Sequence, residues 1–437
     1  MSRPVTATAD PVPTVSRVRP ARQGSLRENN LALAMHHIAA AASPMSRADI
    51  AAATGLTRST AGALVDTLVA GRLVRELVPI ASAGAGRPAT GLVLDPDGAA
   101  GVGLEINVDY LAACAVDLSG AVRHRDVVLA DQRGRSPRAV LADLADLAAD
   151  AVSVARAAGA TVVGARLAVP GLVESEEGLL RVAPNLGWQD RDVLGPLRRD
   201  PRLAGLSLGV DNEANLAALG ELYRGGAGGA SSFVQISGEI GVGAGIVLDG
   251  RLFRGAHGWG GEIGHLAINP DDGPACACGS RGCLEQLAGQ EAILRAARLA
   301  VPAGTTMAAG PGLELLVARA RAGHPPLLAA LERAGRALGV AVAGVVNLID
   351  VHTIVLGGLY ATLAPWVQGP VEREIAARVL AHRWSPVTVT VSALGPDAAI
   401  LGGAGLVVRE VLDHPSARLG APRALLGGGP ERGAGNG

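Results

Sequence analysis

Apolar positions follow two patterns along this chain, a helical period near the N-terminus and a mixed pattern after it. Apolar side chains recur at helical spacing in LRENNLALAMHHIAAAA (residues 26–42), and Pro44 ends that run. Ser46 opens a second short helix that ends at Gly55, and Thr57 opens a third, TRSTAGALVDTLVAGRLV. Two short helices joined by a tight turn that contains glycine predict a helix-turn-helix.

Two short apolar runs after the third helix predict a β-hairpin. They are LVRELVPI (residues 73–80) and TGLVLDP (residues 90–96), and the loop ASAGAGRPA joins them. A hairpin in this place forms a wing, so residues 25–92 are predicted to be a winged helix-turn-helix domain. Residues 1–24 are rich in Pro, Thr, Ser and Arg without apolar periodicity, which predicts a disordered tail.

The pattern changes at residue 101. Three consecutive strands are predicted between residues 101 and 130, a helix near residues 137–158, and a strand at TVVGARLAV (residues 161–169). Strands then alternate with helices to about residue 412, which predicts an α/β body. Residues 413–437 are rich in Gly, Pro and Arg and are predicted to be a second disordered tail.

Charge is uneven along the chain. The sequence of 437 residues has a net charge of −1, but residues 1–92 carry ten arginines against five acidic residues. A basic head on an acidic body fits nucleic-acid binding. A solvated basic surface is the alternative that charge alone leaves open.

No apolar run reaches the roughly 18 residues that a membrane-spanning helix needs. The N-terminus contains arginines but lacks the apolar segment of a secretory signal. We therefore expect a soluble cytoplasmic protein with no membrane partner. Clustered cysteines in that reducing compartment bind metal more often than they form disulfides.

Three of the four cysteines lie in one stretch, GEIGHLAINPDDGPACACGSRGCLEQ (residues 261–286). With an upstream histidine they offer three sulfur ligands and one nitrogen ligand, which suits tetrahedral zinc. The four candidate ligands are His265, Cys276, Cys278 and Cys283. The C-x-C-x4-C spacing differs from the common C-x2-C pair, so buried free thiols remain the alternative. Four protein ligands leave no open position, so the predicted zinc is structural.

The same stretch resembles the signature of the ROK family, named for repressors, open reading frames and sugar kinases. AVPGLV, PNLGW, VDNEANLAALGE, EIGVGAGIVLDG and IVLGGL occur in the family's order. SRADIAAATGLTRSTAGALVDTLVAGRLV and the later AGAGRP resemble the winged helix-turn-helix of the family's transcriptional-regulator branch. The resemblance covers roughly residues 25–412.

The resemblance implies an actin-like, ribonuclease H-like fold of the sugar-kinase type, with two α/β lobes and a ligand cleft between them. We assign residues 97–212 to a small lobe and residues 213–412, with the cysteine stretch, to a large lobe. Whether the C-terminal helix returns to the small lobe is left open. In the family, the histidine and the three cysteines bind zinc, which matches the candidate ligands above.

The resemblance also implies a set of sugar-binding side chains. Carboxylates and amides suit sugars because each hydroxyl both donates and accepts hydrogen bonds. The expected contacts are Asn212, Glu262, His265 and Glu285, with Asn185 and Glu213 nearby. Taken singly, each could instead be a surface carboxylate or a helix cap, since Asn212 and Glu213 open a predicted helix.

Two segments depart from the kinase branch of the family. The phosphate-binding turn of ROK kinases has Asp, two glycines and Thr where this chain has GLEINVDYLAA. The residues at those positions are Glu105, Asn107, Val108 and Asp109. A carboxylate added beside a polyphosphate is repulsive, which argues against ATP. In the later glycine-rich turn, Glu239 and Ile240 replace glycine and threonine.

Glu213 stands at the position of the kinases' catalytic aspartate. Its extra methylene moves the carboxylate by about an ångström, and such a misplacement costs on the order of 10²-fold in rate. Together with the altered turn, this predicts sugar binding without phosphoryl transfer, and hence no catalytic residue. The alternative is an ATP-dependent hexose or N-acetylhexosamine kinase with a fused DNA-binding head.

The first residues of a recognition helix lie against base edges in helix-turn-helix proteins. Here those residues are Thr57, Arg58, Ser59 and Thr60, and Arg58 suits a bidentate pair with guanine. Ser46 and Arg47 suit phosphate contacts. Arg87, in the AGAGRPA loop, suits a narrow minor groove, unless that loop is only a hinge.

These observations predict a sugar-responsive transcriptional repressor of carbohydrate-metabolism genes. It would bind double-stranded operator DNA as a homodimer or homotetramer, and the body would close on a sugar and reorient the heads. None of the motifs names the sugar, the operator or the sign of the response. An effector protein in place of a sugar is a further alternative.

Overall fold

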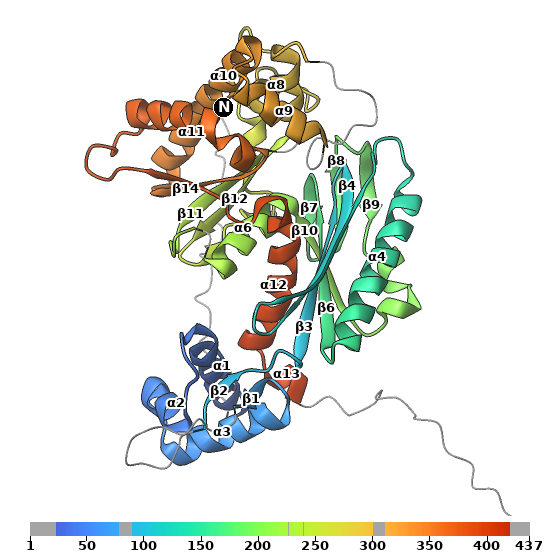
Figure 1. The fold of residues 1–437 in the computed structure, drawn as a ribbon, viewed down its shortest axis with the longest axis vertical. Helices are drawn as coiled ribbons and strands as arrows, with labels where there is room; N and C mark the ends of the chain where they lie inside the picture. Colours follow the sequence, from blue (N-terminus) through green and yellow to red (C-terminus); the bar gives the residue numbers. More distant parts are fainter. Residues whose placement is uncertain (1–22, 78–89, 226, 239, 300–310, 420–437) are drawn as a thin grey trace, which may run out of the picture.

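The computed structural model describes residues 23–77, 90–225, 227–238, 240–299 and 311–419. Arg87, Glu239, the end of the first predicted wing strand and most of both predicted tails lie outside these ranges. Figure 1 shows a small helical head at the bottom and two α/β lobes above it. Among the described helices, none is both long and apolar enough to cross a membrane.

The head consists of three helices and a two-stranded antiparallel sheet. Its elements are α1 (Gln23–Ala40), α2 (Arg47–Thr54), α3 (Arg58–Ala70), β1 (Val74–Glu76) and β2 (Leu92–Leu94). Leu31, Ile50 and Leu68, one from each helix, are buried in a shared core. The predicted helix-turn-helix followed by a pair of strands is thus confirmed for the described residues.

The small lobe contains a five-stranded sheet in the order β10-β6-β3-β4-β5. Its strands are β3 (Ala99–Ile106), β4 (Tyr110–Asp117), β5 (Val122–Leu129), β6 (Thr161–Val169) and β10 (Ser207–Asn212). β3, β6 and β10 are parallel, whereas the pairs β3–β4 and β4–β5 are antiparallel. Helix α4 (Pro137–Ala157) covers one face and α12 (Ala398–Asp413) the other (Figure 1). Strands covered on both faces carry continuous apolar runs, as β3 and β4 do.

A small antiparallel sheet follows β6 in the same lobe. It consists of β7 (Leu172–Glu174), β8 (Leu179–Ala183) and β9 (Trp188–Asp192). The helical turns α5 (Gly195–Arg198) and η1 (Pro201–Leu203) connect it to β10. Buried Leu180 and Trp188 join this sheet to the core beneath α4, so the sheet is part of the small lobe.

The large lobe is built on a five-stranded sheet in the order β13-β12-β11-β14-β15. Its strands are β11 (Phe233–Gly238), β12 (Val242–Leu248), β13 (Arg251–Leu252), β14 (Thr353–Gly358) and β15 (Thr388–Val391). Its helical elements are α6 (Glu213–Arg224), η2 (Ile263–His265), α7 (Glu285–Ala288), α8 (Gln290–Ala296), α9 (Pro311–Arg321), α10 (Pro325–Ile349), α11 (Leu359–Arg378) and η3 (Gly395–Asp397). Val234 and Ile236 of β11 belong to the core under α10 and α11, while Phe233 packs with Ala218 of α6. This alternation places helices on both faces of the sheet.

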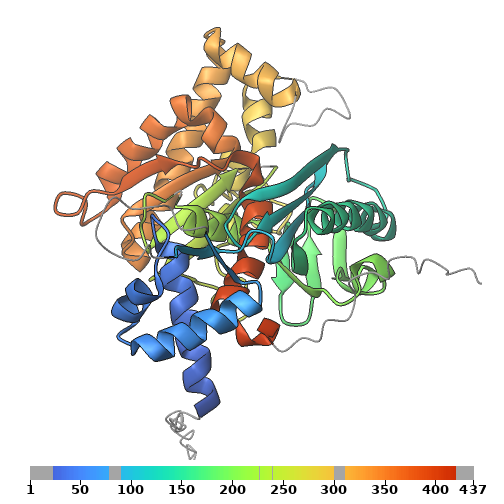
Figure 2. The same cartoon turned by 60° about the horizontal axis from the view of Figure 1, so that its bottom comes forward.

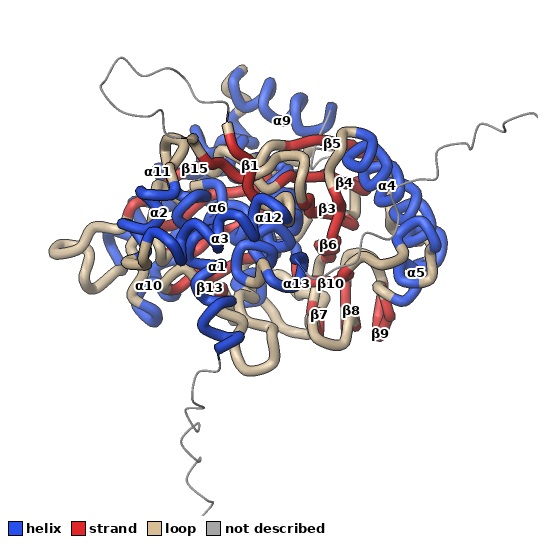
Figure 3. The backbone as a smooth tube through the Cα atoms, turned by 90° about the horizontal axis from the view of Figure 1, so that it is seen from below, coloured by secondary structure: helices blue, strands red, loops and turns tan. Residues whose placement is uncertain are grey.

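The last long helix, α12, returns to the small lobe and packs on β3, β4 and β6. A Cβ at Gly103 of β3 would overlap the carbonyl oxygen of Ile400 in α12, so this close approach requires glycine. The short helix α13 (Ser416–Leu419) then lies inside the segment that the sequence predicts to be a disordered tail. Leu419 packs against the apolar core of the head, which gives the physical reason for this difference. Figures 2 and 3 show the head helices packed across the C-terminal end of α12.

Candidate functional site

A cleft opens between the two lobes and holds about 900 Å³ of space, part of it open to solvent. All six residues predicted to bind sugar line it. They are Asn185, Asn212, Glu213, Glu262, His265 and Glu285. The fold therefore brings into one cleft polar side chains that lie far apart in the sequence.

Strand ends position the small-lobe wall of the cleft. The carboxyl ends of parallel strands meet at one edge of a sheet, and here β3, β6 and β10 share that edge. Val108, Gly171 and Asn212 lie at or just after these strand ends and line the cleft. Gly171 has a φ of +100°, and a Cβ there would overlap the carbonyl oxygen of Val182. The wall therefore requires glycine at this turn.

Asn212 has a structural role at the cleft. It is the N-cap of α6, where its Oδ1 accepts a hydrogen bond from the backbone N–H of Ala214 at 2.8 Å. Its Nδ2 donates to the carbonyl oxygen of Gly171 at 3.0 Å. The helix-cap alternative is thus confirmed for Asn212, and the two bonds hold its carboxamide in one orientation at the cleft wall.

An ion pair beside this cap was not predicted. Arg254, which follows β13, pairs with the carboxylate of Asp211 at the end of β10 at 2.5 Å. Asp211 also accepts a hydrogen bond from the side-chain amide of Asn215 at 3.0 Å. The pair joins the loop that leads to Glu262 to the strand that leads to Asn212. Sequence spacing carries no signal for it, because the partners lie 43 residues apart.

Two acidic side chains, the exposed Glu262 and the half-buried Glu285, lie on the large-lobe wall and lose part of their hydration there. Burial raises the pKa of both Glu262 and Glu285, and the nearby His265 opposes this rise. The Nε2 atom of His265 lies 3.9 Å from a carboxylate oxygen of Glu262. Carboxyl groups and an imidazole in contact offer both donors and acceptors, which is what a polyhydroxylated ligand requires.

The four predicted metal ligands form one cluster. Their ligand atoms all lie within 4.8 Å of one another. Cys278 Sγ is 3.7 Å from Cys283 Sγ, and Cys276 Sγ is 3.8 Å from His265 Nδ1. Sulfur ligands of tetrahedral zinc lie about 3.8 Å apart when each is about 2.3 Å from the metal. The donor set and its spacing therefore fit a zinc ion.

The cluster belongs to the cleft wall, because His265 and Cys278 line the cleft. The loop around it holds only short pieces of regular structure, with single bridges between Ala267 and Cys283 and between Ala275 and Arg281. Such a loop has little apolar core of its own, so a metal ion would contribute much of its stability.

The β3–β4 turn stands where the resemblance places the phosphate loop of the kinases. The side-chain oxygen of Asn107 accepts a hydrogen bond from the backbone N–H of Asp109 at 3.1 Å. The buried carboxylate of Asp109 lies 3.4 Å from the guanidinium of Arg133. The backbone N–H of Asp109 is thus hydrogen-bonded within the turn, and the turn also carries the Asp109 carboxylate.

Side-chain caps begin both helices of the helix-turn-helix. Ser46 and Asp49 form a reciprocal capping box at α2, with N–H to side-chain distances of 2.8 and 3.2 Å. The Thr57 hydroxyl accepts a hydrogen bond from the backbone N–H of Thr60 at 3.2 Å and lies 3.0 Å from the Ser59 hydroxyl. The predicted caps are therefore present, and three hydroxyls gather at the N-terminus of α3.

The predicted DNA-contacting arginines differ in their surroundings. Arg58 is exposed at the first residue of α3. Arg47 instead pairs with Asp66 of α3 at 2.6 Å and with Glu76 of β1, and the hydrogen bond to Asp66 raises its pKa. Arg47 therefore ties α2 to α3 and to the wing, and a DNA phosphate must compete with two carboxylates for it. Arg87 lies outside the described residues.

Comparisons with known proteins place the chain in a family. The model of the ROK family matches residues 101–410, and the model of the IclR helix-turn-helix domain matches residues 32–77. The chain belongs to the ROK family. The predicted family and the predicted fold class, an actin-like two-lobed body with an N-terminal helix-turn-helix, are confirmed.

The ROK relatives include regulators and kinases. A putative xylose repressor of Caldicellulosiruptor sp. (strain Rt8B.4) is 30% identical over 387 residues, which cover 85% of this chain and 93% of that protein. The crystal structure of a ROK family transcriptional regulator, a homologue of the E. coli MLC protein, matches with a TM-score of 0.73 at 26% identity, over 90% of this chain and 99% of that one. A ROK family glucokinase from Streptomyces griseus, solved with glucose and AMPPNP, matches with a TM-score of 0.58 at 26% identity, over 70% of this chain and 98% of that one. The matches to regulators extend into the head, because their coverage of this chain exceeds what the two lobes provide.

Proposed function

We propose that this ROK protein is a sugar-responsive, DNA-binding transcriptional repressor. One observation carries the proposal: the six polar residues of the expected sugar set line one cleft, in a body joined to a helix-turn-helix. Two such sites in one chain couple sugar to DNA when the sugar binds the DNA-competent and DNA-incompetent states with different affinities.

A monosaccharide is the effector that suits this cleft. Three carboxyl groups, three carboxamides and an imidazole line the cleft and offer hydrogen bonds to sugar hydroxyls. The Oδ1 atom of Asn212 accepts from the backbone N–H groups of Ala214 and Asn215, and one Nδ2 hydrogen is donated to Gly171, so the second Nδ2 hydrogen offers a sugar hydroxyl a pre-oriented donor. D-xylose and D-glucose are the first sugars to test, because the names and ligands of the relatives include them.

The cleft binds sugar in this proposal without transferring phosphate. Support comes from the β3–β4 turn, where the side-chain oxygen of Asn107 already accepts a hydrogen bond from the Asp109 backbone N–H, a group that a phosphate would otherwise use. Glu213 lines the cleft at the position of the kinase base, with a longer side chain than the aspartate it replaces.

Zinc would bind at His265, Cys276, Cys278 and Cys283 and would be structural. When bound, it supplies a fixed charge that holds four loop residues together. With Nδ1 toward the metal, His265 presents Nε2 near Glu262 in the cleft, which orients both groups for a ligand.

The head would bind operator DNA as part of a homodimer, with a homotetramer as the alternative. Thr57, Arg58, Ser59 and Thr60 would face base edges, and Ser46 and Arg47 would approach phosphates. Arg87 would enter a minor groove. Two heads related by a two-fold axis bind half-sites about 34 Å apart or a multiple of that distance.

Titration calorimetry with D-xylose, D-glucose and other sugars, each with and without ATP and magnesium, tests this function. We expect one sugar class to bind and ATP to have no effect. Glu262→Gln should weaken the sugar by about 10- to 100-fold, since a hydrogen bond to a charged group contributes about 1.5–3 kcal/mol. Glu314→Gln, the same change at an exposed site on α9, should leave affinity unchanged.

Two outcomes would contradict the proposal. Consumption of ATP in the presence of a bound sugar would make the protein a kinase with a fused head. Failure of every sugar to bind would leave the cleft without a sugar role and would favour a protein effector.

A further inference from the structure

The apolar core of the head is continuous with apolar residues of the body. Its buried residues form one cluster with residues of the small lobe and of α12. The body residues in that cluster are Ala99, Leu118, Val163, Val407, Val411 and Leu412. Among the described residues, no member of the cluster comes from residues 213–397 of the large lobe. The head is therefore packed on the small lobe and on α12.

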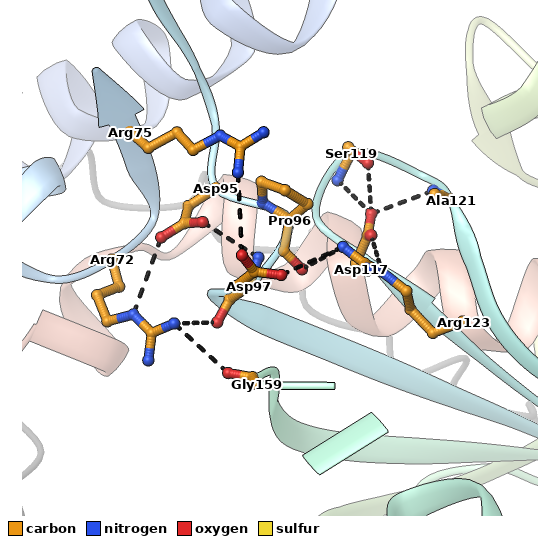
Figure 4. A network of polar contacts seen from close by, with 10 residues as sticks. All are labelled: Arg72, Arg75, Asp95, Pro96, Asp97, Asp117, Ser119, Ala121, Arg123 and Gly159. Atoms are coloured by element: carbon orange, nitrogen blue, oxygen red, sulfur yellow. Dashed lines mark hydrogen bonds and ion pairs between the residues drawn. The ribbon is translucent and has the colours of Figure 1, made fainter. Parts of the chain in front are cut away.

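A polar network at the same junction joins the wing to the small lobe (Figure 4). Arg72, just before β1, donates hydrogen bonds to the carbonyl oxygens of Asp97 at 2.6 Å and Gly159 at 3.4 Å. Arg123 of β5 donates to the buried carboxylate of Asp117 at 2.5 Å and to the carbonyl oxygen of Pro96 at 3.1 Å. The short turn between β2 and β3 is thus held from both sides, and it cannot act as a free hinge.

The C-terminal segment adds a third attachment. His36 of α1 lies 2.7 Å from the carboxylate of Asp413 at the end of α12. The guanidinium of Arg418 donates to the carbonyl oxygen of Val163 in β6 at 3.3 Å. Because α12 and α13 contact both the head and the small lobe, they bind the two parts together.

Helix α12 is itself fixed to the small lobe. Nη2 of Arg166 in β6 donates to both carboxylate oxygens of Glu410 at 2.5 and 2.6 Å, and Nε and Nη2 of Arg125 in β5 form a bidentate pair at 2.7 and 2.7 Å with Asp397, the N-cap residue of α12. These pairs hold the two ends of the helix, and bidentate geometry restrains rotation as well as separation.

Toward the large lobe, α12 meets α6 through glycines. A Cβ at Gly402 of α12 would overlap the carbonyl oxygen of Leu216, and a Cβ at Gly220 of α6 would lie 2.5 Å from the carbonyl oxygen of Ala398. Apolar side chains of both helices, Leu219 and Leu406 among them, share one cluster at this contact, and shear consists of small sliding motions of helices packed in this way. Helix α6 begins at the cleft, because its N-cap Asn212 and its first residue Glu213 both line the cleft.

We infer that the head, the small lobe and α12 form one rigid block, and that a sugar in the cleft moves this block against the large lobe by shear between α6 and α12. The second half of this inference rests on the proposed function. The DNA-binding head would then change its position relative to the large lobe, not relative to the small lobe.

Distance measurements between site-specific probes test the block. Probes on unnatural amino acids at exposed Ala53 (α2), Ser153 (α4) and Arg333 (α10) avoid the cysteines. Without sugar, the Ala53–Ser153 pair should give one narrow distance distribution, and a broad one would overturn the block. With saturating D-xylose or D-glucose, the Ala53–Arg333 distance should shift while the Ala53–Ser153 distance stays the same. A sugar-dependent shift of Ala53–Ser153, or no shift of Ala53–Arg333 when calorimetry shows binding, would overturn the inference while the proposed function stands.

Glycine substitutions test the contact between α6 and α12. Gly220→Ala should reduce the sugar-dependent change in operator affinity several-fold, because a methyl group there separates the two helices. Gly344→Ala in α10, where the added Cβ meets no atom within 4 Å, is the matched control and should retain the full change. Full coupling in Gly220→Ala would overturn the role of this contact. If Gly220→Ala does not fold, the probe distances in the wild-type protein still test whether the head and the small lobe move together against the large lobe.

Discussion

At the residue scale, side chains at the cleft carry structural and binding roles together. Asn212 closes the N-terminus of α6 and lines the cleft, and Asp211 holds Arg254 while it accepts a hydrogen bond from Asn215. Polar groups held in this way lose little conformational freedom when a ligand binds. The same bonds mean that a substitution at the cleft changes stability and affinity together, so each test needs a control that separates them.

Asn212→Ala should lower the free energy of unfolding by about 1 kcal/mol, because α6 loses its cap. It should also weaken sugar binding, which titration calorimetry would measure. Ser136→Ala removes the corresponding cap of α4, where the hydroxyl accepts from the Ala139 N–H at 3.3 Å. This control should lose similar stability and keep sugar affinity. Equal sugar affinity in both variants would mean that Asn212 is only a helix cap.

Arg58 and Arg47 should respond differently to alanine substitution. Arg58→Ala should weaken operator binding by about 1–3 kcal/mol and relax specificity at one base pair, with the melting temperature unchanged. Arg47→Ala should lower the melting temperature, because the bonds to Asp66 and Glu76 that join α2, α3 and β1 are lost. Binding assays against matched and mismatched operators, with thermal melts, separate the two effects. An Arg58→Ala variant that binds all operators normally would exclude this residue from base contact.

At the element scale, the stability of each segment follows the apolar surface that it buries. Helices α10 and α11 bury a continuous apolar stripe against β11 and β14, whereas the cysteine loop has two isolated bridges. A loop with so little regular structure needs a bound metal or a partner to hold one conformation. The loop carries His265 in the cleft wall, so its order and sugar affinity should change together.

Cys283→Ser should therefore reduce zinc content well below one ion per chain, lower the melting temperature and weaken sugar binding. Cys114→Ser, at the buried cysteine outside the cluster, should keep the zinc. Mass spectrometry of metal content, thermal melts and calorimetry measure these three properties. Purified wild-type protein with far less than one zinc per chain would contradict the metal assignment.

At the scale of the whole molecule, the shared core predicts that head and body unfold together. All four tryptophans lie after residue 92, so their fluorescence follows the body, and a fluorophore at Ala53 follows the head. The two transitions should coincide, and a sugar at 100 times its dissociation constant should stabilise both by about 2.7 kcal/mol. Loss of the Ala53 signal before the tryptophan signal would show a head that unfolds alone.

Much of the fold and of the site was accessible from the sequence. Helical and strand periods predicted α1, α2, α4 and β3–β6 almost to their ends, because these patterns are local. The third helix was predicted to continue to Val74, but α3 ends at Ala70 with Gly71 as its C-cap, and Val74 begins β1. Residue type and spacing identified the four cluster residues, and the family resemblance identified the six cleft residues; the fold brings both sets together. Helix α13 was missed because it depends on the contact between Leu419 and the core of the head, which is distant in the sequence.

By itself, the sequence determined the type and order of the elements, the basic head and the candidate metal ligands, which depend on spacing and residue type, local properties of the chain. The polar set of the cleft came from the resemblance to the family. Tertiary structure alone decided that Arg47 faces two carboxylates, that Arg254 braces Asp211, and that the head shares its core with α12. These contacts join residues far apart in sequence, and only the path of the folded chain brings such residues within bonding distance.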